Sequence, residues 1–157
     1  MRSTASNEAP LAELSMTLPA TAEHLGSVYA GMSQFWAELE RRHPSPPDAA
    51  WRAYFDTAVG EIVANVVRHA YADTHDSADA TVSIAIRGFA DRVEATFRDR
   101  GVPYTGSIAD AQLPGDGADT LDLPESGWGL AVTLAAVDDL SYTRDADINC
   151  WRLIKKL

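Results

Sequence analysis

The sequence predicts an α+β fold built of two layers, one of helices and one of strands. Apolar residues recur every three or four positions in two long segments of the N-terminal half, which is the spacing of amphipathic helices. Elsewhere apolar and polar residues alternate over short runs, which is the pattern of half-buried strands. Because helical and strand-like segments come in blocks, an α+β sandwich is favoured over a parallel sheet.

The ends of the expected elements carry their own signals. Asp48 follows two prolines and can cap a helix, and Arg41 and Arg42 suit the last turn of the helix before it. Gly88 and Asp91 mark a hairpin turn. In chain order, the patterns predict a strand (14–18), a helix (25–43), a helix (48–71), an antiparallel hairpin (81–87 and 93–97), a helix (130–137) and two strands (140–143 and 150–155).

Length and composition indicate one domain. The chain has 157 residues, of which 46% are hydrophobic and 23% are charged, and this balance suits a single core. Residues 1–13 lack periodicity and are expected to form a flexible tail before a domain spanning 14–157. No apolar run reaches the ~20 residues that cross a bilayer, and no signal-peptide core follows Arg2. Cys150 is alone and forms no internal disulfide, so a cytoplasmic location is expected.

The formal net charge is −10 at pH 7, with 13 basic and 23 acidic side chains. Nucleic-acid binders present a basic face to phosphates, and no such cluster is visible here. A direct nucleic-acid partner and an anionic membrane surface are therefore not expected. A protein partner with a basic surface remains compatible with this charge.

Three short motifs carry the functional prediction. Glu61, Asn65 and His69 are spaced by four on the second helix, on the flank away from its valine-rich stripe. The second motif, Asp99-x-Gly101-x-Pro103, follows the second hairpin strand, and the third, Gly127-x-Gly129-Leu130, precedes the third helix. Taken singly, these motifs are equally typical of a solvated helix face, a turn and a flexible helix entry.

In this order and spacing, the three motifs resemble the N, G1 and G2 boxes of the GHKL ATPase superfamily. With His69-Ala70-Tyr71 and the proline of the second motif, they are most similar to the anti-sigma factor serine kinases of bacterial partner-switching systems. The resemblance covers roughly residues 14–157. It implies the GHKL, or Bergerat, ATP-binding fold, in which a mixed and mostly antiparallel sheet is covered on one face by helices.

The resemblance also implies roles for single residues. Asn65 is expected to ligate Mg²⁺, and Glu61 to act as the catalytic base that orients a substrate hydroxyl. Asp99 is expected to bind the adenine amino group, with the Gly101 backbone lying against the base. The remaining residues expected to contact ATP are Arg68, His69, Pro103, Gly127, Gly129 and Leu130. Residues 104–126 are expected to form an ATP lid, called the lid segment below.

The implied function is that of an ATP-dependent serine/threonine protein kinase acting as an anti-sigma factor. Such a protein phosphorylates a serine on a STAS-type anti-anti-sigma partner and sequesters a sigma factor, thereby regulating transcription, and it is expected to be a homodimer. The lid segment, however, is acidic and has no Lys or Arg between Gly101 and Gly129. Negative charge beside a triphosphate opposes closure, so a nucleotide-gated binding module without efficient phosphoryl transfer is the alternative.

Two further alternatives have less support. The ATPase module of a histidine sensor kinase needs a phospho-accepting helical domain, for which 157 residues leave no room. A zinc site could use His69, Asp73, His75 and Asp76, but their spacing is not that of a compact metal site.

Overall fold

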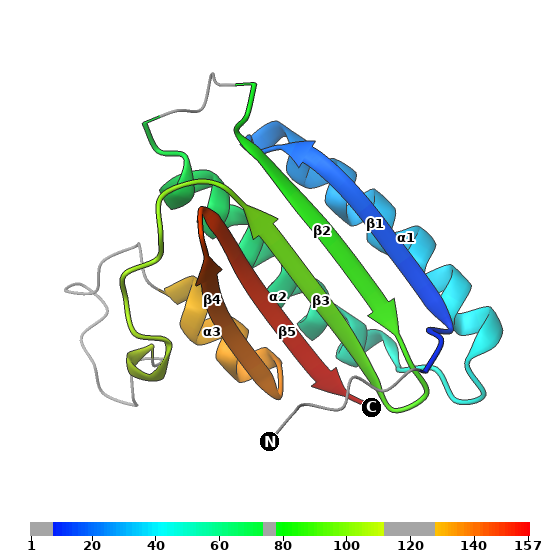
Figure 1. Ribbon diagram of the computed structural model, residues 1–157. Coiled ribbons are helices and arrows are strands. Elements are labelled where there is room, and N and C mark those ends of the chain that lie inside the picture. Colours follow the sequence, from blue (N-terminus) through cyan, green and yellow to red (C-terminus); the bar gives the residue numbers. More distant parts are fainter. Residues whose placement is uncertain (1–7, 74–77, 112–127) are drawn as a thin grey trace.

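A five-stranded antiparallel sheet forms one layer of the molecule, and the helices pack on one of its faces (Figure 1). The computed structural model describes residues 8–73, 78–111 and 128–157. The strands lie in the order β1-β2-β3-β5-β4, and every neighbouring pair is antiparallel. The expected two-layer α+β fold is confirmed, but the described sheet contains no parallel pair and is therefore not mixed. The strands are β1 (Ala12–Pro19), β2 (Thr81–Gly88), β3 (Arg92–Asp99), β4 (Asp139–Asp145) and β5 (Ile148–Lys156).

The three expected α-helices are present, although the bounds of some elements differ from those expected. They are α1 (Leu25–Arg42), α2 (Ala49–Asn65) and α3 (Trp128–Ala136), with short 3-10 turns η1 (Ala22–His24) and η3 (Ile108–Asp110). The second helix was expected to run to Tyr71, but α2 ends at Asn65 and the chain continues as a π-helical turn, η2 (Val66–Ala70). At the N-terminus, β1 begins at Ala12, so residues 12 and 13 belong to the sheet and not to a tail.

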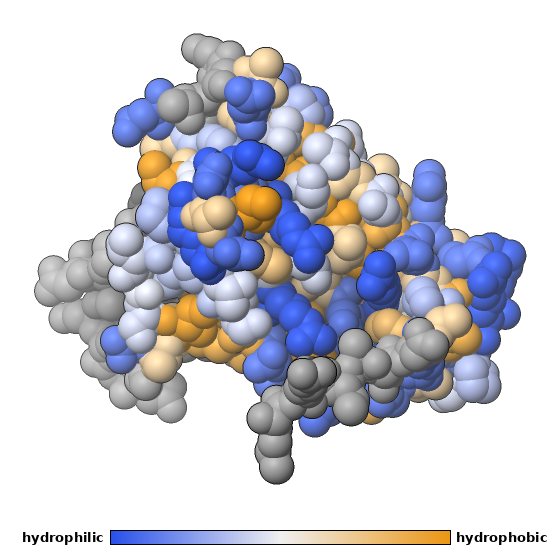
Figure 2. Space-filling view, in the orientation of Figure 1, coloured by the Kyte–Doolittle hydropathy of each residue, from blue (hydrophilic) through white to orange (hydrophobic). Residues whose placement is uncertain are grey.

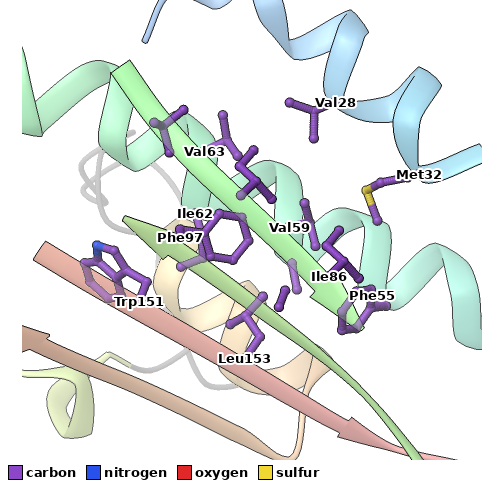
Figure 3. Close-up of a cluster of buried hydrophobic side chains, with 14 of the residues drawn as sticks. Val28, Met32, Phe55, Val59, Ile62, Val63, Ile86, Phe97, Trp151 and Leu153 are labelled. Carbon is purple, nitrogen blue, oxygen red and sulfur yellow. The ribbon is translucent and has the colours of Figure 1, made fainter. Parts of the chain in front are cut away.

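The core lies between the helices and the covered face of the sheet. Figure 3 shows Val59, Ile62 and Val63 of α2 meeting Phe97 of β3 and Leu153 of β5. All five side chains are buried, which accounts for the alternating pattern of the strands and the valine-rich stripe of α2. Removing this apolar area from water is the main contribution to the stability of the fold.

Polar contacts fix the two longest helices in place. The Asp48 side chain accepts a hydrogen bond from the backbone N–H of Trp51 at 2.8 Å, so Asp48 is the predicted N-cap of α2. Between the helices, the indole N–H of Trp36 donates to Asp56 at 2.8 Å. Burial raises the pKa of Asp56, and the Trp36 hydrogen bond and the Arg52 charge oppose this rise.

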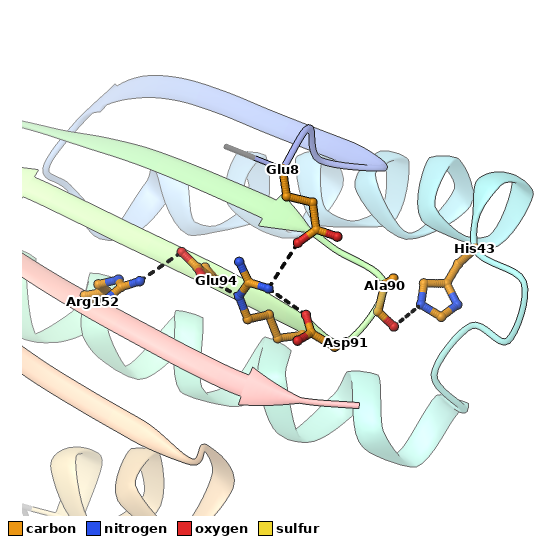
Figure 4. A network of polar contacts seen from close by, with 7 residues as sticks. Glu8, His43, Ala90, Asp91, Glu94 and Arg152 are labelled. Carbon is orange, nitrogen blue, oxygen red and sulfur yellow. Dashed lines mark hydrogen bonds and ion pairs between the residues drawn. The ribbon is translucent and has the colours of Figure 1, made fainter. Parts of the chain in front are cut away.

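A second polar network holds the β2–β3 turn, at the opposite end of β3 from Asp99 (Figure 4). Arg92 donates to Glu94 at 2.7 Å and to Asp91 at 2.6 Å, and Arg152 donates to Glu94 at 3.1 Å. His43 accepts from the backbone N–H of Ser45 through Nδ1, so its Nε2 carries the proton and donates to the Ala90 carbonyl at 3.0 Å. These contacts join α1 to the sheet away from the candidate site.

The other face of the sheet carries a mixture of polar and apolar side chains and no described helix (Figure 2). Among them, Thr17 and Ser83 are joined by a hydrogen bond of 2.9 Å between their hydroxyl groups. No helix within the described ranges is long and apolar enough to cross a membrane.

Candidate nucleotide-binding site

A cavity of about 330 Å³ lies where the end of α2, the ends of β3 and β5, and the start of α3 come together. Its size falls in the range of small-molecule pockets, and its lining is more apolar than polar. Its lining includes five residues of the three sequence motifs: Asn65, His69, Asp99, Pro103 and Leu130. The remaining lining residues are Val66, Ala70, Val102, Tyr104, Ser107, Asp110, Ala111, Tyr142, Asn149 and Trp151.

Asp99 is the polar centre of this cavity. It is only 3% exposed, and its Oδ1 accepts hydrogen bonds from the Gly101 backbone N–H at 2.9 Å and from the Asn149 amide at 2.7 Å. Its Oδ2 is buried and has no hydrogen-bond partner among the residues that the structure describes. Burial raises the pKa of Asp99 above its ordinary value, against the hydrogen bonds from Asn149 and Gly101 and the charge of Arg144. A buried acceptor without a partner is costly, so a ligand that brings a donor to Oδ2 recovers free energy.

The π-helical turn η2 brings Asn65 and His69 to the cavity. Such turns are rare and frequently occur at functional sites. Asn65 is the last residue of α2 and His69 lies in η2, and both line the cavity, whereas Glu61 does not. Asn65 and His69 therefore face the cavity, whereas Glu61, one turn earlier in α2, lies outside its lining.

Gly101 is required by the packing of the protein itself. A Cβ at this position would clash with the backbone oxygen of Ala70. That oxygen accepts a hydrogen bond from the N–H of Val102 at 2.8 Å, so the segment after β3 is held tightly against η2. Packing alone thus accounts for a glycine here, and that its backbone also lies against an adenine base stays a prediction.

Tyr71, just after η2, reinforces the same junction. Its hydroxyl group donates to the carbonyl of Thr81 at 2.9 Å and accepts from the backbone N–H of Arg100 at 2.8 Å. The side chain is buried, and this burial raises the pKa of the phenol. Tyr71 thus connects the end of the helix to β2 and to the end of β3, which fixes Asp99 relative to Asn65.

Glu61 lies beside the start of α3. A Cβ placed on Gly129 would stand 2.4 Å from Glu61 Oε2 and 3.6 Å from Asn65 Oδ1, so these two side chains converge on the glycine. On the other side of α2, Gly60 leaves room for the hydroxyl group of Tyr29. Burial raises the pKa of Tyr29, and the negative charges of Asp56 and Glu61 raise it further.

Not all expected site residues meet at the cavity. Arg68 is exposed, does not line the cavity, and donates through Nε to the carbonyl of Ala64 at 3.3 Å. Gly127 and residues 112–126 of the lid segment lie outside the described residues. The described part of that segment, 104–111, contributes Tyr104, Ser107 and Asp110 to the cavity wall.

No metal cluster is formed by the parts of the chain that the structure describes: no three His, Cys, Asp or Glu side chains gather there in a way that could hold an ion. Two members of the zinc alternative, His75 and Asp76, lie outside the described residues. Asn65 supplies one uncharged oxygen ligand, which suits Mg²⁺ because this ion usually takes its other ligands from phosphates and water.

Sequence reasoning missed Asn149, which is 2% exposed and contacts Asp99 directly. One signal could have found it. Asn149 occupies an inward position of β5, in phase with the buried Trp151 and Leu153, where a polar side chain needs a buried partner. That this partner is Asp99 follows only from the β3–β5 register, which places the two residues directly opposite each other. The aromatic wall of Tyr104, Tyr142 and Trp151, with ring centroids 4.7–5.6 Å apart, was also not predicted.

The cavity fits a purine better than it fits a bare ion. Its aromatic and aliphatic wall can hold a flat ring, and one buried carboxylate oxygen can accept from an exocyclic amine. Asn65 and His69 line the same cavity and are available to a phosphate group and its counterion. Fold and site thus define a class: an α+β domain with a cavity suited to a nucleotide, lined by residues of α2, η2, β3, β5 and α3.

Comparisons with known proteins agree with this class. A model of the histidine kinase-like ATPase domain matches residues 18–155, and the chain belongs to this family. The RsbU and RsbW domains of Rv1364c from Mycobacterium tuberculosis have a similar structure, with a TM-score of 0.60 and 26% sequence identity. The match covers 96% of this chain and 34% of that chain, so this chain spans about a third of its length. No curated protein matches the sequence significantly.

The family predicted from the three motifs is therefore confirmed. Membership of an ATPase family implies ATP binding, and that ATP binds in this cavity remains a prediction. The individual roles of Glu61, Asn65 and Asp99 remain predictions.

Proposed function

We propose that this chain is an ATP-dependent serine/threonine protein kinase that acts as an anti-sigma factor in the cytoplasm. It would phosphorylate a serine on a STAS-type anti-anti-sigma partner and sequester a sigma factor, and we expect it to act as a homodimer. The observation that carries the proposal is the convergence of Glu61 and Asn65 on Gly129, next to a cavity that holds an unpartnered Asp99 oxygen. The structural similarity to a chain with an RsbW domain supports it.

Each site residue would have a role that follows from its position in the cavity. Asp99 Oδ2 would accept a hydrogen bond from the adenine amine, and Tyr104, Tyr142 and Trp151 would contact the ring. Asn65 would hold Mg²⁺, which would offset the negative charge of the phosphate groups. The acidic side chains of the lid segment make that offset more important.

Glu61 would act on the substrate serine. It would accept the proton of the hydroxyl group while the serine oxygen forms a bond to the γ-phosphorus of ATP. The bond between that phosphorus and the bridging oxygen would break, so that ADP leaves with the electron pair. Gly129 allows this role, since any larger residue would push the Glu61 carboxylate aside.

Transfer of labelled phosphate from Mg-ATP to a candidate STAS protein tests the kinase. We expect wild-type transfer to fall by about 100-fold or more in Glu61→Gln, the effect of losing a general base. Glu40→Gln is the matched control, because Glu40 is exposed on α1 and pairs only with Arg52 at 3.5 Å. Absence of wild-type transfer, or equal transfer by Glu61→Gln, would overturn the catalytic role.

A nucleotide-gated binding module without phosphoryl transfer is the second candidate. It is favoured by Asp110, a carboxylate of the lid segment that already lines the cavity, since the described lining contains no Lys or Arg. This candidate predicts that partner capture in the presence of ATP survives Glu61→Ala but is lost in Asn65→Ala. Equal capture by both variants would exclude nucleotide gating.

A further inference from the structure

The amide of Asn149 is held in one orientation by its neighbours. Its Oδ1 accepts from Arg144 at 2.5 Å and from the Tyr142 hydroxyl group at 2.7 Å. Its Nδ2 donates to Asp99 Oδ1 at 2.7 Å. A guanidinium group has only donors and an ionised carboxylate has only acceptors, so the reversed amide would lose both contacts. Arg144 therefore determines which end of Asn149 faces Asp99.

This orientation leaves Asp99 with one free oxygen. Oδ1 already accepts two hydrogen bonds, from Asn149 and from the Gly101 N–H, whereas Oδ2 accepts none. Both donors belong to buried or tightly packed parts of the chain, since Asn149 is 2% exposed and Gly101 is pressed against Ala70. A ligand thus meets a carboxylate that can accept from one donor and not from two.

The two purine bases differ in this respect. Adenine presents a single exocyclic amine beside a ring acceptor, whereas guanine presents a ring N–H and an exocyclic amine side by side. A carboxylate with both oxygens free binds that guanine edge through two parallel hydrogen bonds. A carboxylate with one oxygen occupied does not.

Building on the proposed function, we infer that Asn149, oriented by Arg144, is a specificity-determining residue that makes the site select adenine over guanine nucleotides. Asn149 acts through Asp99 and is a positioning residue. It also donates to the carbonyls of Gly101 and Val102 at 3.2 Å, and the Tyr142 hydroxyl accepts from the N–H of Tyr104 at 3.0 Å. Asn149 therefore holds the Asp99 carboxylate and the backbone of Gly101 and Val102, and Tyr142 holds the start of the lid segment at Tyr104.

Calorimetric titration with ADP and with GDP tests the inference through the ratio of the two dissociation constants. The wild type should prefer ADP. Asn149→Ala should lower this preference by about tenfold or more, the factor that one hydrogen bond to a charged group supplies. A purely structural role for Asn149 would weaken both nucleotides equally and leave the ratio unchanged, and that result would overturn the inference.

Arg144→Met keeps the test decisive if Asn149→Ala does not fold, because Arg144 is exposed. This variant should lower the ADP preference in the same direction by a smaller factor. Arg152→Met is the matched control: Arg152 lies on the neighbouring strand β5, pairs with Glu94, and does not line the cavity, so the ratio of this variant should equal that of the wild type. An unchanged ratio in Arg144→Met would also contradict the inference.

The result of the nucleotide-selectivity test can be distinguished from the result of the kinase test. A wild type that binds ADP selectively but transfers no phosphate would leave the inference intact and overturn the kinase. A wild type that binds ADP and GDP equally would overturn the inference while the kinase stands. A wild type that binds neither nucleotide would overturn both.

Discussion

Burial gives the Asp99 carboxylate two linked properties. It raises the pKa of the group, and it leaves Oδ2 without the water that would otherwise solvate it. In the empty site the charged form is therefore disfavoured, whereas a bound adenine amine would stabilise it. Protonation and nucleotide binding compete for the same oxygen.

This competition predicts a pH dependence of affinity. ADP affinity should fall as the pH is lowered from neutral through the raised pKa of Asp99, because the protonated carboxyl no longer accepts from the amine at full strength. The stability of the empty protein changes in the opposite sense: the contribution of Asp99 is fully present below its unfolded value near 3.8 and is lost as the pH rises through the folded pKa. Calorimetry across this pH range, with Asp99→Asn subtracted, measures the effect. An affinity independent of pH after this subtraction would contradict it.

Asp99→Asn tests the charge itself. The amide keeps an oxygen for Asn149 and the Gly101 N–H but turns an N–H₂ donor toward the adenine amine. We expect ADP affinity to fall by about 10- to 100-fold, since hydrogen bonds to charged groups contribute about 1.5–3 kcal/mol. The empty protein should be as stable as the wild type or more stable, because a neutral amide is cheaper to bury. Retained affinity in a folded variant would show that Asp99 does not contact the base.

At the scale of elements, the junction between η2 and the segment after β3 sets the distance between Asn65 and Asp99. Gly101 packs against the Ala70 carbonyl there, and Tyr71 connects the same turn to β2 and β3. Because Gly101 packs against backbone atoms, its neighbours cannot move aside as a flexible side chain can.

Gly101→Ala should therefore lower the free energy of unfolding by about 1–3 kcal/mol, the usual cost of overpacking. Gly26→Ala is the matched control, because a Cβ at Gly26 of α1 meets nothing within 4 Å. In that helix, alanine should stabilise by about 0.5–1 kcal/mol. Urea denaturation of both variants measures the difference. Equal stabilities would show that the junction can open without cost.

The elements also show what sequence alone can and cannot give. Hydrophobic spacing predicted the three α-helices and the five strands, because the residues that each element buries recur with its period, as do Val59, Ile62 and Val63 of α2. Asn65 and Asp99 were predicted as candidate site residues because each lies in a short sequence motif. Asn149 was not predicted, because it contacts Asp99 only through the β3–β5 register. The π-helical turn was missed because Val66–Ala70 carries no glycine or proline to mark it.

At the scale of the whole molecule, the net charge of −10 is the dominant electrostatic feature. Like charges repel within the compact state and reduce its stability. The same charge attracts partners with a basic surface and slows association with acidic ones.

Added salt should accordingly stabilise the protein without nucleotide. Raising NaCl from about 10 mM to about 150 mM shortens the Debye length from about 30 Å to about 8 Å and screens the repulsion. We expect a higher urea midpoint at the higher salt concentration, at constant pH. A lower midpoint would mean that surface ion pairs such as Arg87–Glu13, and not net repulsion, dominate the balance.

The central claim is that an adenine nucleotide binds in the cavity lined by Asn65, Asp99 and Leu130. A crystal structure with ADP and Mg²⁺ tests it most directly. The account predicts the adenine amine within hydrogen-bond distance of Asp99 Oδ2, the ring against Tyr104, Tyr142 or Trp151, and the metal at Asn65. Nucleotide bound elsewhere, or a cavity filled by the protein's own side chains at saturating ADP, would contradict it.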